Sequence, residues 1–324
     1  MNHMNSIQKK WTPEGPVSKG AEGYHNAVID ASWNVDNINE LIAIIKPDIN
    51  ENDIVVDFGA GTGASAISIL EQLSTKINLW LVDNSPAWLA KAYELLGKNP
   101  NVSFFILDKK GGKYDTLDKT IGKNAADMVI SANTFHLVPD LESAFGGIFR
   151  ALKNPGKFVF QSGNISREGR PQDVLMIEDT IHRVHDIALG IINSEPMFEE
   201  YRIGLSERMI SEVSQRKFVF PSPRGMDVYL EALKLAGFQY EAPIYKKIRV
   251  KYADWMNFLR VRRLQAGILP EIGGRYPSPK EEKDRDAAIA LAAKQLFLEL
   301  EEKNPLANSK SFAVEWAYVK CRKG

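Results

Sequence analysis

The sequence is short of cysteine, of long apolar runs and of net charge. Cys321 is the only cysteine among 324 residues, so an internal disulfide is excluded and a reducing, cytoplasmic location is expected. No apolar run is long enough to span a bilayer, and residues 1–20 are polar, without the apolar stretch of a signal peptide. Because 41 Lys and Arg balance 41 Asp and Glu, no overall positive charge attracts the chain to nucleic acid or membrane.

Arginine is also absent from the first part of the chain. Lysine is frequent there, yet the first arginine is Arg150. This difference in composition predicts that the two parts of the chain serve different tasks.

Short apolar runs alternate with helical patterns through the first half. The runs that read as strands are residues 54–58, 79–83, 102–107, 127–131 and 157–161. Five strands separated by helices predict a doubly wound, mostly parallel α/β sheet. Two later runs, residues 238–250 and 312–320, bring the expected number of strands to seven.

The remaining segments fall outside this alternation. We expect residues 1–50 to be an arm with an irregular lead followed by a lid helix whose apolar residues run from Ile38 to Ile45. Residues 51–164 are the expected core, 165–225 a helical insertion that includes a long helix over 170–194, and 226–324 the rest of the sheet. A second helical insertion is expected at 253–303, and the two insertions together are predicted to form a cap. Its last helix is predicted to start at a capping box, Ser278 to Glu281.

Acidic residues and glycines follow the predicted strands. Asp57 precedes Gly59-Ala60-Gly61-Thr62-Gly63, where glycines let the backbone turn sharply and approach a ligand. A carboxylate at this turn would repel the pyrophosphate of a dinucleotide but would favour a cationic ligand. Asp83 ends the next strand, where a carboxylate can accept ribose hydroxyls, and Asp108 ends the third. Each acid alone is usually a solvated strand end; the set of three predicts a nucleoside-like ligand with positive charge.

These residues resemble the motifs of the class I, Rossmann-like S-adenosylmethionine-dependent methyltransferases. Residues 55–63, 82–89, 127–133 and 152–157 resemble four motifs of that family, although Lys157 replaces the last glycine of the fourth. The resemblance covers about residues 50–165 and implies S-adenosylmethionine as the cofactor. The residues that it would place at the cofactor are Tyr24, Asp57, Gly59, Ala60, Gly61, Asp83, Asn84, Asp108, Lys109 and Asn133. Aromatic residues before the first strand often close over the cofactor in this family, and Tyr24 and Trp33 occupy that stretch; core packing is an equal alternative for Trp33.

Candidate substrate and catalytic residues come from the ends of the fourth and fifth predicted strands. His136 stands where an imidazole can act as a general base, although packing beside the cofactor is the preferred interpretation because methyl transfer often relies on positioning and desolvation. Gln161 and Asn164 are candidates for hydrogen bonding to a substrate, and His25 is placed with them. His182 and His185 lie near Glu178, but their spacing does not suit a metal site, so no metal is predicted.

Arginines gather in the two insertions. They are Arg167, Arg170, Arg183, Arg202, Arg208, Arg224, Arg260, Arg262, Arg263 and Arg275. Since guanidinium groups bind carboxylates in a bidentate manner, an anionic small-molecule acceptor is one prediction, with Arg167 as the candidate residue. Surface ion pairs are the alternative for most of them.

The functional alternatives are a nicotinamide-dependent oxidoreductase on a related sheet and an inactive partner subunit with this fold. The acceptor and the oligomeric state do not follow from the sequence.

Overall fold

The computed structural model describes residues 10–206, 219–269, 278–303 and 311–324. The strands are β1 (Ile54–Phe58), β2 (Asn78–Asp83), β3 (Val102–Ile106), β4 (Lys109–Lys110), β5 (Lys113–Tyr114), β6 (Ala126–Ala132), β7 (Leu152–Ser162), β8 (Ile165–Ser166), β9 (Arg224–Gly225), β10 (Gln239–Tyr240), β11 (Ile244–Lys251) and β12 (Ser311–Lys323). The helices are α1 (Lys19–Val28), α2 (Ser32–Ile45), α3 (Ala64–Gln72), α4 (Pro86–Leu96), α5 (Leu117–Ile121), α6 (Leu141–Ala151), α7 (Ile177–Ser194), α8 (Glu199–Arg202), α10 (Met226–Ala236), α11 (Tyr252–Leu259), α12 (Arg262–Ile268) and α13 (Pro279–Lys303).

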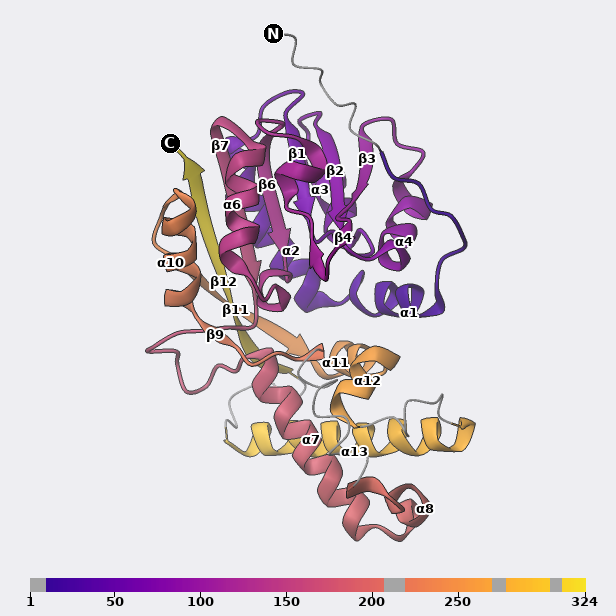
Figure 1. Cartoon of the computed structure of the whole chain (residues 1–324). Helices are drawn as coiled ribbons and strands as arrows, with labels where there is room; N and C mark the ends of the chain where they lie inside the picture. Colours follow the sequence, from indigo (N-terminus) through magenta and orange to yellow (C-terminus); the bar gives the residue numbers. More distant parts are fainter. Residues whose placement is uncertain (1–9, 207–218, 270–277, 304–310) are drawn as a thin grey trace.

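The central sheet confirms the predicted doubly wound α/β fold. Its order is β10-β12-β7-β6-β1-β2-β3, with β11 also paired to β12. Within this sheet, the neighbouring strands β7, β6, β1, β2 and β3 all pair in parallel, whereas β12 runs antiparallel to β7 (Figure 1). The strand predicted over 238–250 is divided into β10 and β11, which follow one another along β12. Pro243, which has no N–H to donate, lies in the gap between them.

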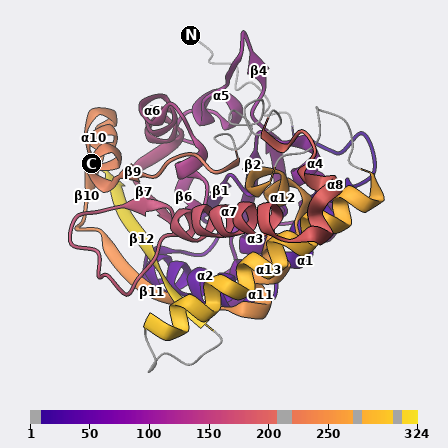
Figure 2. The ribbon, with the colours of Figure 1, turned by 90° about the horizontal axis from the view of Figure 1, so that it is seen from below.

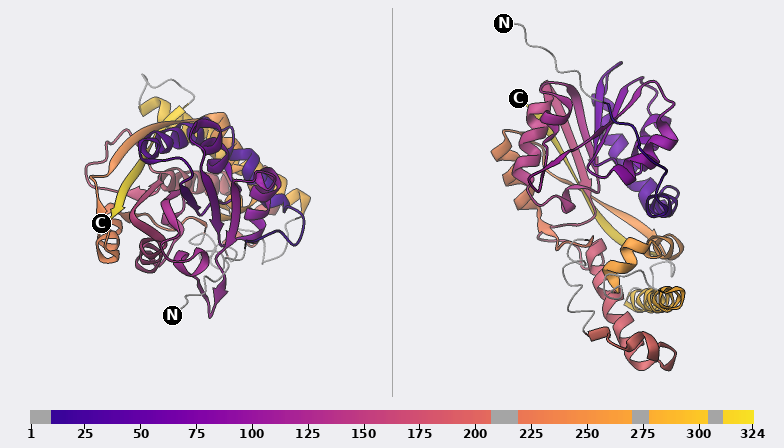
Figure 3. Two further views of the ribbon diagram at one scale, coloured as in Figure 1. Left: turned by 90° about the horizontal axis from the view of Figure 1, so that it is seen from above. Right: turned by 45° about the vertical axis from the view of Figure 1, so that its right-hand side comes forward.

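Helices cover both faces of this sheet (Figure 3). Alternate residues of each strand point to opposite faces, so Val55 and Val56 of β1 belong to two separate buried clusters. The cluster on the side of α2 and α3 continues into α7 and α11–α13. The second cluster lies between the sheet and α5, α6 and α10 and is rich in phenylalanine.

The helices of the two insertions lie beyond one edge of the sheet. The chain leaves β7 for α7 and leaves β11 for α11 at this edge, which is where the parallel strands end (Figure 1). Seen from below, α7 and α13 cross in front of the sheet (Figure 2). The predicted capping box of α13 is confirmed: the Glu281 amide donates to the Ser278 hydroxyl, and the Ser278 amide donates to the Glu281 carboxylate. The division into domains stays a prediction.

Two local expectations were wrong. The stretch expected to be irregular contains α1, whose N-terminus is capped by the Ser18 hydroxyl, and α2 already begins at Ser32. Part of the helix expected from residue 170 is extended, because Leu175 forms a bridge to Val314 and α7 begins only at Ile177. Both differences depend on contacts that are distant in sequence, and local periodicity does not report them.

Candidate active site

The glycine loop between β1 and α3 has a backbone that other residues would strain. Gly59, Gly61 and Gly63 have φ of +77°, +56° and +83°. A Cβ on Gly59 would lie 2.3 Å from the Thr134 hydroxyl oxygen, so this glycine also lets the segment after β6 lie against the loop. The turn therefore presents bare backbone at the edge where β1, β2 and β6 end.

The Asp83 carboxylate holds this loop in place. One of its oxygens accepts from the Gly61 amide at 2.8 Å, and the other accepts from the Ser85 amide at 2.8 Å. Burial raises the pKa of Asp83, while the amides of Gly61 and Ser85 act in the opposite direction. Each carboxylate oxygen has a second lone pair, so Asp83 can still accept from the hydroxyls of a ligand.

Asp57 lies beneath the loop with one carboxylate oxygen satisfied. Its side chain is 1% exposed, and Oδ2 accepts from the Ser65 hydroxyl at 3.0 Å. Oδ1 is buried and has no hydrogen-bond partner within the described ranges. Burial, assisted by the nearby charge of Asp83, raises the pKa of Asp57 to about 7. A ligand cation would supply the compensation that this carboxylate lacks.

Helix α1 brings both of its predicted site residues to the loop. The Tyr24 ring lies 4.4 Å from the ring of Trp88, which in turn faces Gly61. His25 is buried, and its Nδ1 lies 3.1 Å from the Thr62 hydroxyl in the glycine loop. Burial lowers the pKa of His25 and raises that of Tyr24. His25 therefore contacts the cofactor loop, so its predicted role with the substrate stays a prediction.

Three predicted cofactor residues are exposed at the far end of this edge. Asn84 follows β2, and Asp108 and Lys109 follow β3. The Asp108 carbonyl accepts from the Asp115 amide, which closes the β4–β5 hairpin, and the Lys109 ammonium lies 5.3 Å from the Tyr114 ring. Their side chains remain accessible to a ligand.

Asn133 connects β6 with the last strand. It adopts φ of +52°, its amide N–H donates to the Gln161 carbonyl, and its Oδ1 accepts from Trp316 Nε1 at 3.0 Å. The Trp316 ring also stacks on Trp33 of α2. Gln161 is fully buried, and neither atom of its side-chain amide has a partner in the described part of the chain.

The surroundings of His136 fix its protonation state. Its Nδ1 lies 3.0 Å from the Ser162 hydroxyl, which already accepts from the Asn164 amide. The hydroxyl can donate to Nδ1 or accept from it, depending on the imidazole tautomer. Burial, assisted by the charge of Arg224, lowers the pKa of His136 to about 4. At neutral pH the ring is therefore uncharged.

Arg167, the predicted anion-binding residue, forms an internal ion pair. Its Nε and Nη2 donate to the two Glu315 carboxylate oxygens at 2.9 and 2.8 Å, and its guanidinium lies 4.2 Å from the Tyr245 ring. Carboxylates or backbone carbonyls also pair with other arginines of the set, among them Arg170, Arg183, Arg202, Arg224 and Arg260. Arg208 and Arg275 lie outside the described residues.

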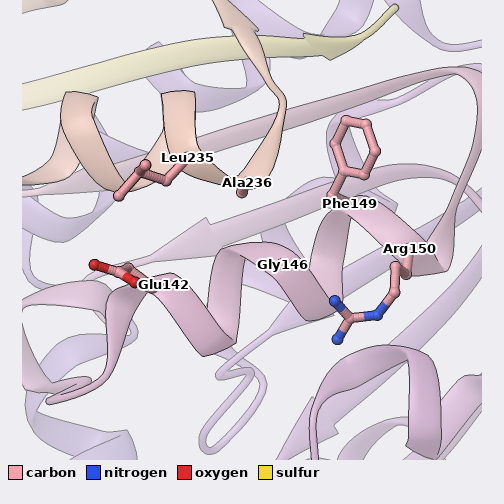
Figure 4. Close-up of a pocket in the computed structure, with 6 residues that line it drawn as sticks. All are labelled: Glu142, Gly146, Phe149, Arg150, Leu235 and Ala236. Atoms are coloured by element: carbon pink, nitrogen blue, oxygen red, sulfur yellow. The ribbon is translucent and has the colours of Figure 1, made fainter.

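One surface hollow lies away from this loop. Figure 4 shows it between α6 and α10, lined by Glu142, Gly146, Phe149, Arg150, Leu235 and Ala236. None of these residues belongs to the glycine loop or to the ends of β1, β2 and β6, so we assign the functional site to the loop instead.

No cluster of three metal-ligating side chains occurs among the residues with a described structure. Within the same ranges, no helix is long and apolar enough to cross a bilayer.

Sequence reasoning missed two residues that shape the site, Trp316 and Ser162, which position Asn133 and His136. Ser162 directly follows the strand predicted over 157–161 and was detectable as a polar residue there. Trp316 carried no local signal, because its partner lies far away in the sequence. Arg224, one of the predicted set of arginines, donates to the Phe135 carbonyl beside His136.

Residues 49–191 match the family model described as a methyltransferase domain. The chain is 28% identical over 160 residues to malonyl-[acyl-carrier protein] O-methyltransferase 1 of Ilyobacter polytropus, covering 49% of this chain and 54% of that protein. It is 30% identical over 135 residues to the chloroplastic 2-methyl-6-phytyl-1,4-hydroquinone methyltransferase of Spinacia oleracea, covering 41% of this chain and 36% of that protein. The matches thus span about half or less of these two relatives.

The fold has counterparts among solved structures. A protein from Galdieria sulphuraria, described as a sarcosine dimethylglycine methyltransferase, superposes with a TM-score of 0.52 at 12% identity, covering 95% of this chain and 99% of that one. At this identity the likeness concerns the fold alone. The sequence match identifies residues 49–191 as a methyltransferase domain, and the chain that carries it has the Rossmann-like α/β fold.

Proposed function

We propose that the protein transfers the methyl group of S-adenosylmethionine to a small-molecule acceptor. The observation that carries the proposal is the buried, unpaired Oδ1 of Asp57 beside the glycine loop, which suits a cationic cofactor and disfavours a pyrophosphate. When bound, S-adenosylmethionine supplies an activated methyl group on a positively charged sulfur. The residues that would hold it are those of the glycine loop with Asp57, Asp83 and Tyr24, and Asn84, Asp108 and Lys109 at the exposed end.

The chain's own contribution to the reaction is positioning and exclusion of water. The lowered pKa of His136 makes its imidazole a weak base, so it orients a group by hydrogen bonding rather than by accepting a proton. Helices α1 and α12 narrow the site, since Tyr24 and Arg263 both lie near the Trp88 ring. An oxygen or nitrogen nucleophile that is held in line with the S–CH₃ bond and shielded from water needs little further assistance.

The nature of the acceptor belongs to this proposal. The names of the two relatives specify malonyl-[acyl-carrier protein] and 2-methyl-6-phytyl-1,4-hydroquinone, which are both organic acceptors. A carboxylate-bearing acceptor would have to displace Glu315 from Arg167 or to use another cation of the insertions. A cytoplasmic location and a cap formed by residues 165–225 and 253–303 remain part of the same proposal.

Calorimetry with S-adenosylmethionine, S-adenosylhomocysteine and NAD tests the proposal directly. We expect both adenosyl ligands to bind and NAD to fail. Transfer is then followed by mass spectrometry, as a gain of one methyl group on an acceptor from a metabolite extract. Binding of NAD in preference would indicate the oxidoreductase, and cofactor binding without any transfer would indicate an inactive partner subunit.

A further inference from the structure

A group of buried polar atoms without partners lies at the ends of β6 and β7. They are Gln161 Oε1 and Nε2, Trp33 Nε1 and Asn37 Nδ2, and none has a hydrogen-bond partner in the described ranges. Gln161 and Asn37 are 0% exposed, and Trp33 is 4% exposed. Because buried polar groups are normally hydrogen-bonded, four orphaned atoms in one region point to a ligand or to ordered water.

Ring stacking and hydrogen bonds connect the residues that carry these atoms. Trp33 stacks on Trp316 with ring centroids 5.8 Å apart, and Trp316 Nε1 donates to Asn133 Oδ1. The Asn133 amide donates to the Gln161 carbonyl. The two tryptophans are therefore connected, through Asn133, to the backbone of Gln161, the residue that carries the orphaned side-chain amide.

A second path reaches the same place from β12. Tyr318 lies in register with Gln161 across the β7–β12 pair, so both side chains are on the same face of the sheet. The Tyr318 hydroxyl lies 3.1 Å from the Asn37 carbonyl and donates to it. Helix α2 is thereby fixed over Gln161, with Asn37 and Trp33 both on the face that it buries.

The site adjoins the proposed position of methyl transfer. Asn133 belongs to the segment after β6, and the neighbouring Thr134 lies against Gly59 of the cofactor loop. Phe258 of α11 packs on Trp33 and also contacts Tyr24, whose ring lies against Trp88 beside the loop. A series of aromatic rings thus connects Trp33 with the cofactor loop.

All four orphaned atoms are uncharged. Glu315, which pairs with Arg167, alternates along β12 with Trp316 and Tyr318 and so lies on the opposite face of the sheet. A carboxylate placed against the four atoms would meet no charged group among them, and burial of an unpaired charge is costly. A neutral ligand with hydroxyl groups would satisfy the same atoms at no such cost.

We propose that the methyl acceptor is an uncharged, hydroxylated aromatic ring bound against Trp33 and Gln161, a proposal that rests on the methyltransferase function above. One hydroxyl donates to Gln161 Oε1, and an oxygen of the ring accepts from Gln161 Nε2 or Trp33 Nε1. Methylation of a second hydroxyl forms an O–CH₃ bond as the S–CH₃ bond breaks, and the hydroxyl proton is released to solvent. The rings of Trp33, Phe258 and Trp316 supply the flat apolar contact that such a ligand needs.

A matched pair of probes tests the proposal. Resorcinol (1,3-dihydroxybenzene) is neutral, and 3-hydroxybenzoate replaces one hydroxyl by a carboxylate. Binding of each to the full chain is measured by saturation-transfer NMR, with and without S-adenosylhomocysteine, in wild type, Gln161→Leu and Trp33→Phe. Gln239→Leu, at an exposed glutamine of β10, and Trp11→Phe, outside the site, are the matched controls.

We expect resorcinol to bind at least about fivefold more tightly than 3-hydroxybenzoate. Each site variant should weaken resorcinol binding by about fivefold, the loss typical of one hydrogen bond, and the controls should not. Equal or tighter binding of 3-hydroxybenzoate, or unchanged resorcinol binding in Gln161→Leu, overturns the proposal. Failure of resorcinol to bind wild type also overturns it and leaves internal water as the occupant. Affinity for S-adenosylhomocysteine, measured on the same samples, shows separately whether the proposed function stands.

Discussion

The raised pKa of Asp57 predicts that binding of S-adenosylmethionine is coupled to loss of a proton. In the free protein this carboxyl has a pKa of about 7, so near pH 6.5 it is largely protonated. A bound cation lowers the pKa, because an opposite charge favours the carboxylate. Binding should therefore release up to about one proton near pH 6, and affinity should rise as the pH approaches and passes 7.

The same group makes the free protein less stable at high pH. A carboxyl whose pKa is raised on folding contributes stability that is present below its unfolded value of 3.8 and is lost as pH rises through about 7. The difference of about 3 units corresponds to about 4 kcal/mol at most, at 1.36 kcal/mol per unit. Asp57→Asn carries no charge, so it should be more stable than wild type at pH 8 by up to this amount and should differ much less at pH 4.

Two measurements check this reasoning. Calorimetry of S-adenosylmethionine binding, repeated in buffers of different ionisation enthalpy, counts the protons released, and urea unfolding at pH 4 and pH 8 gives the free energy of unfolding. Asp57→Asn should abolish proton release and weaken binding, whereas Asp186→Asn, an exposed acid on α7, should change neither. Proton uptake on binding, or equal stability of wild type and Asp57→Asn at pH 8, would refute the assignment.

Three further predictions concern the loop and the residues beside it. Asp83→Ala removes the acceptor for two loop amides and for the ribose, and should weaken S-adenosylhomocysteine binding by about 1.5–3 kcal/mol in calorimetry. Gly59→Ala forces a Cβ to within 2.3 Å of Thr134 at φ +77°, and should lower the melting temperature and abolish cofactor binding; wild-type affinity in this variant would contradict the described loop. His136→Ala should reduce kcat only a few-fold, and wild-type kcat should show no inflection between pH 6 and 8 from this residue, whose pKa is about 4; a loss of about 10²-fold or more would restore it as a general base.

The sequence by itself determined the sheet and the cofactor edge. Strand runs, the glycines after β1 and the acids at Asp57 and Asp83 are local features, and parallel strands bring their ends together whatever surrounds them. The positive φ values of the loop follow from the same local sequence, since glycine alone adopts them without strain.

The acceptor side was decided only by tertiary structure. Trp316 reaches Asn133 across 183 positions of sequence, and Arg167 reaches Glu315 across 148, so no local pattern indicates either pair. The composition of the insertions suggested arginines open to an anion, but the fold neutralises Arg167 and instead buries the uncharged amide of Gln161, which has no partner among the residues that the structure describes. Charge in a sequence can be counted, whereas which charges remain available depends on the side chains that packing brings within hydrogen-bond distance.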